Sequence, residues 1–189
     1  MLSADTLAQV YSRPERDGPH GGIRWPEMFG CAFKSGRTIS LGKIRPRGGS
    51  GTAGAKGTTF ESLSGPFFAY EYSVAGAYRL FVRDLRSGRV VRNVPSGPSV
   101  TRFHFGVDPI VSVVVKSSDG AVAWLVENEN VLPVEPGVPN ESEFTLFALD
   151  KNGERQLAIG KNLDPSSLAI AGSTLYWTQG GTPSSTHLN

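Results

Sequence analysis

Three histidines, His20, His104 and His187, are the side chains of this sequence best suited to acid–base or metal chemistry. None of them has a second histidine, or the single cysteine Cys31, at the short spacing that zinc ligands use. A serine nucleophile of the hydrolase type would sit in a Gly-x-Ser-x-Gly turn, which the sequence lacks. The sequence therefore predicts no metal site and no catalytic residue.

A glycine-rich stretch from Gly49 to Gly54 matches the Gly-x-Gly-x-x-Gly pattern of dinucleotide-binding turns. That pattern binds phosphate only where a helix begins directly after it, because the helix N-terminus supplies the N–H donors. Here the strand-forming residues Gly57 to Phe60 follow instead. We therefore interpret 45–57 as a flexible basic loop, and the sequence predicts no cofactor.

Three aromatic residues recur at equivalent places in a repeat. Tyr70, Trp124 and Trp177 each end a short apolar run that follows a turn glycine. A position repeated in this way favours packing of one unit against the next. The alternative is an aromatic lining for a sugar or peptide ligand. On that alternative, the predicted ligand-binding residues are Arg102, His104, Tyr70, Trp124 and Trp177.

The repeat predicts four-stranded units. The turn glycines Gly65, Gly120 and Gly172 recur with a period of about 50 residues, typical of stacked β arrays. Two full units are expected over 58–94 and 101–159. Hairpins at 28–41 and 167–178 would pair to complete a third unit.

The whole predicted organisation is a single all-β domain over 25–181. It contains the flexible loop 45–57 and an insertion loop at 128–142. We expect a poorly ordered N-terminal segment, 1–24, and a disordered tail, 182–189.

These units resemble the blades of a β-propeller. The hairpin pattern Ala-x-Asp-x-x-Gly, present in two variants over 82–89 and 148–155, is similar to the outer strand pair of many blades. The run 164–177 resembles the inner pair of uncharacterised bacterial, chiefly actinobacterial, propeller-like proteins. The resemblance implies a partial or open propeller-like array of four-stranded antiparallel units. A β-sandwich or distorted barrel is the alternative fold.

Composition and charge limit the kinds of partner that the sequence predicts. The chain has 189 residues, 39% hydrophobic, and a net charge of +2, which is too small to indicate nucleic acid binding. Basic residues without acids occupy 28–60, and acidic residues without bases occupy 117–150. This separation indicates either two binding faces, contact between copies of the chain, or solvated loops. No segment is apolar enough to span a membrane and no signal peptide precedes the domain, so the compartment stays open, with export expected only from a truncated start.

The sequence predicts a repeat architecture but contains no set of residues spaced for catalysis. This combination favours a non-enzymatic binding or scaffold module for an unknown protein or carbohydrate ligand. Self-association that completes the blade array is a further expectation. The alternative is a propeller-type hydrolase or lyase acting on a small or carbohydrate-like substrate. Its candidate residues around a central channel are Asp84, Asp108 and His104.

Overall fold

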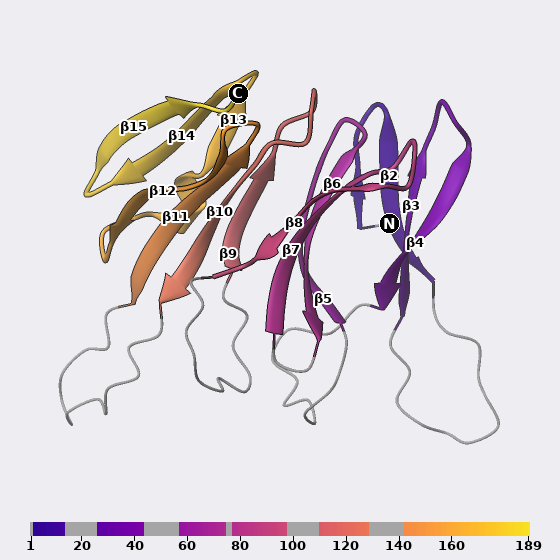
Figure 1. Ribbon diagram of the computed structural model, residues 1–189, viewed down its shortest axis with the longest axis horizontal. Coiled ribbons are helices and arrows are strands. Elements are labelled where there is room, and N and C mark those ends of the chain that lie inside the picture. The colour runs from indigo at the N-terminus through magenta and orange to yellow at the C-terminus, as the bar shows by residue number, and fades with distance from the viewer. Residues whose placement is uncertain (1, 14–25, 44–56, 75–76, 98–109, 129–141) are drawn as a thin grey trace.

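The computed structural model describes residues 2–13, 26–43, 57–74, 77–97, 110–128 and 142–189 (Figure 1). These residues form four antiparallel sheets, and in each sheet the strands pair in sequence order. Sheet A contains β1 (Ser3–Ala4), β2 (Ala8–Arg13), β3 (Glu27–Ala32) and β4 (Arg37–Lys43). Sheet B contains β5 (Gly57–Ser64), β6 (Phe67–Val74), β7 (Ala77–Asp84) and β8 (Val90–Pro95).

Sheets C and D continue the series toward the C-terminus. Sheet C contains β9 (Ile110–Val115), β10 (Val122–Asn128), β11 (Glu143–Asp150) and β12 (Gly153–Gly160). Sheet D has three strands, β13 (Ala169–Ala171), β14 (Thr174–Gln179) and β15 (Thr182–His187), and follows a single 3-10 turn at Pro165–Ser167. The prediction of an all-β fold built from antiparallel units is confirmed, and none of the four sheets closes on itself.

The four sheets stack side by side along the long axis of the molecule (Figure 1). The first strands of neighbouring sheets approach one another, β1 beside β5, β5 beside β9 and β9 beside β13. Sheet A lies at one end of the stack and sheet D at the other. The array is therefore open and propeller-like.

Alternating side chains build one hydrophobic core between each pair of neighbouring sheets. Along β6, Phe67 and Ala69 face sheet C, whereas Phe68 and Tyr70 face sheet A. The same alternation places Val122 against sheet B and Ala123 against sheet D. Sheets B and C therefore have a core on each face, and their second strands carry continuous apolar runs, Phe67 to Tyr70 in β6 and Val122 to Val126 in β10.

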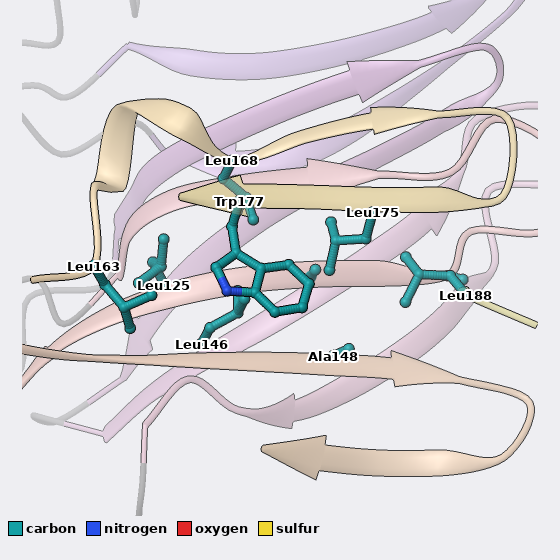
Figure 2. Packing of buried hydrophobic residues seen from close by; sticks show 10 residues of the cluster. Leu125, Leu146, Ala148, Leu163, Leu168, Leu175, Trp177 and Leu188 are labelled. Atoms are coloured by element: carbon teal, nitrogen blue, oxygen red, sulfur yellow. The ribbon is translucent and has the colours of Figure 1, made fainter. Parts of the chain in front are cut away.

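The core between sheets C and D shows how a terminal sheet is attached. Trp177 and Leu175 of β14 point toward sheet C and meet Leu125 and Leu146 (Figure 2). Leu188, which is fully buried, closes the same cluster after β15.

Three predictions about the chain ends are wrong. Residues 182–187 of the expected tail form β15. Residues 3–4 and 8–13 of the segment expected to be poorly ordered form β1 and β2, with Val10 fully buried, and its remainder, 14–24, lies outside the described residues. The hairpins 28–41 and 167–178 lie in separate sheets at opposite ends and do not complete one unit. The sequence does not predict β15 because its residues, Thr-Pro-Ser-Ser-Thr-His, show no alternation of apolar and polar side chains. Its proline is tolerated because β15 is an edge strand.

The meander gives the molecule two different rims. The connection from the first to the second strand of each sheet, and from the third to the fourth strand of sheets A, B and C, lies at one rim. The connections from the second to the third strand, and from one sheet to the next, lie at the other. The first rim consists of tight turns, and Gly65, Gly120 and Gly172 occupy equivalent turns there with φ of +56°, +73° and +59°, which confirms the predicted repeat.

The second rim carries the longer connections. The strand ends that the connections 14–26, 44–56, 96–109 and 129–142 join all lie there. We call these two surfaces the turn rim and the loop rim. The predicted loops 45–57 and 128–142 fall largely on 44–56 and 129–141, outside the described residues, and their strand ends at Lys43, Gly57, Asn128 and Glu143 belong to the loop rim.

Candidate ligand-binding rim

Aspartates on the turn rim stabilise the turns themselves. Asp84 Oδ1 accepts hydrogen bonds from the backbone N–H of Arg86, at 2.9 Å, and from its guanidinium Nε, at 3.0 Å. Asp5 Oδ2 accepts from the N–H of Gly65, at 2.8 Å, and so connects sheet A to sheet B. Burial alone would raise the pKa of Asp84, but the Arg86 hydrogen bonds and charge lower it below its ordinary value. Asp84, a candidate for catalysis in the enzymatic alternative, is thus engaged in a turn.

Asp150 anchors the C-terminus of the chain to sheet C. Its buried carboxylate accepts from the N–H of Asn152, at 2.8 Å, from the N–H of Asn189, at 2.9 Å, and from Arg155 Nη2, at 2.8 Å. Burial alone would raise the pKa of Asp150, and these donors together with the Arg155 charge hold it below its ordinary value. Lys116, also buried, donates from Nζ to the carbonyl of Leu188, at 2.9 Å.

The three aromatic residues of the repeat lie in three different cores. Tyr70 packs between sheets A and B, Trp124 between B and C, and Trp177 between C and D. Trp124 is fully buried and donates from Nε1 to the carbonyl of Ser96, at 2.7 Å. Their packing between units is therefore confirmed. The expectation that they line one ligand-binding face is not met, because the sheets separate them.

Burial raises the pKa of Tyr70, although the nearby guanidinium of Arg83 opposes that shift. The tyrosine is therefore neutral at ordinary pH, as a residue packed between two sheets should be. Arg102, His104 and Asp108 lie outside the described residues, so the structure places none of them relative to the aromatic set.

The described ends of the loop rim are charged. At the sheet A end, Arg13, Glu27 and Lys43 are register partners across β2, β3 and β4. At the sheet C end, Glu127 and Glu143 flank the segment 129–141, and Glu127 accepts a hydrogen bond from the hydroxyl of Ser142. The described parts of this rim on sheets A and C thus differ in charge, with bases prevailing on sheet A and acids on sheet C.

Glu71 is a buried carboxylate that sequence reasoning missed. It is the register partner of Leu80, so it shares the face of sheet B that is turned toward sheet C, and its exposed fraction is 0%. Its position two residues after Ala69 and four after Phe67 was a usable signal, because that parity places it on a core-facing row. An ionisable group buried in this way is uncommon and marks Glu71 as a position to test.

Within the described ranges, no three histidine, cysteine, aspartate or glutamate side chains gather as metal ligands would. Across the same ranges, no helix has the length and apolar character to cross a membrane. No known family model matches this chain, and no curated protein is significantly similar to it.

Proposed function

We propose that this protein is a non-enzymatic binding or scaffold module whose ligand surface is the loop rim. The observation that carries the proposal is the asymmetry of the two rims. Turns of a few residues close one rim, while the connections of a dozen residues or more that the structure contains all join strand ends at the other. Long connections positioned by a rigid scaffold are where binding surfaces concentrate.

Charge supports the same surface. The sequence of the segment 44–56 contains Arg45, Arg47 and Lys56, and that of 129–141 contains Glu129, Glu135 and Glu141. The described strand ends beside them carry the same signs, Lys43 on sheet A and Glu127 and Glu143 on sheet C. Charges of one sign grouped at a rim favour a partner of the opposite sign and make its binding sensitive to salt. We therefore propose a protein or carbohydrate ligand that carries basic groups near the sheet C end.

The test uses an array of lysine- and arginine-rich peptides and an array of glycans. The variant combines Glu129→Gln, Glu135→Gln and Glu141→Gln, and its matched control is Glu154→Gln, an exposed acid at the start of β12 on the turn rim. Binding by the unaltered chain should weaken at least about tenfold in the triple variant. The control should bind as the unaltered chain does. Equal binding by all three proteins, or no binding on either array, contradicts the proposal.

The alternative that the protein is a hydrolase or lyase remains a prediction, but with fewer candidate residues. Asp84 is committed to its turn, so a hydrolase or lyase site would depend on His104 and Asp108. Screening the chain and its His104→Ala variant with glycoside, lactone and ester substrates would test it. Turnover that disappears in the variant, with the fold intact, would favour the enzyme over the binding module.

A further inference from the structure

One aromatic pair recurs in three of the four sheets. In each case the two rings are register partners on the second and third strands and stack with similar geometry. The pairs and their ring-centroid distances are Tyr11–Phe29 at 5.8 Å, Tyr70–Phe81 at 5.6 Å and Trp124–Phe147 at 5.6 Å. The repetition means that the three pairs occupy the same place in the structural unit.

Two of these pairs are covered by the preceding sheet. Tyr70 and Phe81 lie in the core between sheets A and B, and Trp124 and Phe147 lie in the core between B and C. The third pair has no preceding sheet in the described chain. Val10 and Met28 face sheet B, so the adjacent Tyr11 and Phe29 point to the opposite, outer face of sheet A.

Further apolar side chains extend this outer face toward the turn rim. Continuing the strand register puts Leu7 and Phe33 on it at that rim and Leu2 beside Tyr11, and their exposed fractions are 53%, 49% and 43%. The guanidinium of Arg13 lies over both rings of the pair, 5.2 Å from the centroid of Tyr11 and 5.0 Å from that of Phe29. Tyrosine, phenylalanine and arginine grouped in this way are the residues enriched at protein interfaces.

The opposite end of the stack is different. On the outer face of sheet D, Tyr176 is 44% exposed and its register partners are Ala169 and Ser185. Thr174 and Thr178 flank it on the same face of β14. A polar outer face is what a terminal capping unit of a stacked array requires. Among the described residues, no sheet covers the outer face of sheet A, where the aromatic and apolar side chains lie beside Gln9 and Ser40.

We infer that the outer face of sheet A binds the same face of a second copy of this chain, in a two-fold symmetric dimer. The molecule already stacks sheets face to face three times, and this face carries the same aromatic pair that two of those contacts bury. Its charged row, Arg13, Glu27 and Lys43, contains both signs, so a copy turned about a two-fold axis can place acids near bases. A self-complementary patch of this kind is what an isologous interface needs.

The experiment is light scattering on the full chain, separated by gel filtration over a range of concentrations. The unaltered chain should have twice the mass of one chain. Leu7→Lys, at an exposed position that leaves the cores intact, and Phe29→Lys should each give a monomer. Tyr176→Lys on the outer face of sheet D is the matched control and should remain a dimer. Circular dichroism and thermal unfolding of each variant separate dissociation from loss of the fold.

Three outcomes would overturn the inference. A monomer at every concentration excludes the dimer, and a dimer that persists in folded Leu7→Lys and Phe29→Lys places its interface elsewhere. A Tyr176→Lys variant that dissociates instead indicates a head-to-tail ring between sheets A and D. The dimer is tested at Leu7 and Phe29 of sheet A and the ligand surface at acids of the segment 129–141, so either proposal can fail while the other stands.

Discussion

At the scale of single residues, buried polar groups stabilise the joins between structural units. Asp150 holds the N–H of Asn189 and the guanidinium of Arg155, while Trp124 Nε1 donates to the carbonyl of Ser96. The sequence predicted the turn after Asp150 from its spacing to Gly153, but not these longer contacts. Ser96 lies 28 residues from Trp124, and Asn189 lies 39 residues from Asp150, whereas spacing rules describe only near neighbours in the chain.

Replacing Asp150 with asparagine should destabilise the fold by about 1–3 kcal/mol at pH 7, because an amide NH₂ would face the N–H donors that the carboxylate now accepts. The folded-state pKa of Asp150 lies below its ordinary value of 3.8. Its contribution is therefore full above that value and is lost as the pH falls through it toward the folded-state pKa. Urea unfolding of the chain and of Asp150→Asn at several pH values should show a difference that shrinks below about pH 4. A constant difference would contradict the assignment, and exposed Glu154→Gln is the control.

The buried indoles of Trp124 and Trp177 differ in whether their Nε1 donates a hydrogen bond. Trp124 Nε1 has an acceptor, whereas no described group accepts from the buried Nε1 of Trp177. Phenylalanine at either position removes ring volume, but only at Trp124 does it also break a hydrogen bond and leave the Ser96 carbonyl without its donor. Chemical unfolding should show that Trp124→Phe costs about 1 kcal/mol more than Trp177→Phe. The reverse order would show that this hydrogen bond is not a significant stabiliser.

At the scale of elements, the strands of sheets B and C were predictable and the ends of the chain were not. β5 to β8 run from Gly57 to Pro95, within one residue of the predicted unit 58–94, because strands such as β6 carry apolar residues on both faces and turns flank them. β1 has two residues and β15 is almost wholly polar, so neither carries a periodic apolar signal. Their positions depend on tertiary contacts, such as the burial of Leu188 beside sheet D.

The repeated turn glycines share a conformation but differ in their surroundings. A Cβ at Gly120 would lie 2.9 Å from Cδ1 of Phe67 in the neighbouring sheet, whereas at Gly172 it would meet nothing within 4 Å. Both have positive φ, so alanine costs about 1 kcal/mol of backbone strain at either place. Thermal unfolding should show that Gly120→Ala is clearly the more destabilising, since it also displaces Phe67. Equal effects would mean that the turn of sheet C does not pack against sheet B.

At the scale of the whole molecule, the period predicted stacked quartets of strands but gave the wrong number of units. Two full units and two half units were expected, and the structure has four separate sheets. The error has a physical origin. Pairing of the hairpins 28–41 and 167–178 would have buried an open strand edge of each. The sequence does not show that these hairpins instead belong to sheets A and D at opposite ends of the described stack. Of the predicted binding residues, the structure places the three aromatics in cores, because a repeated aromatic position is a packing position.

Hydrogen–deuterium exchange on the full chain, resolved by peptide, tests the stack most directly. Sheets B and C are buried on both faces and sheets A and D on one, so opening the central sheets requires breaking two cores. The slowest exchange is expected in peptides covering 67–72, 78–84, 122–128 and 143–150, with faster exchange in 182–187 and, in the monomeric Leu7→Lys variant, in 3–13. Slowest exchange in the terminal sheets, or rapid exchange throughout 122–150, would contradict this arrangement.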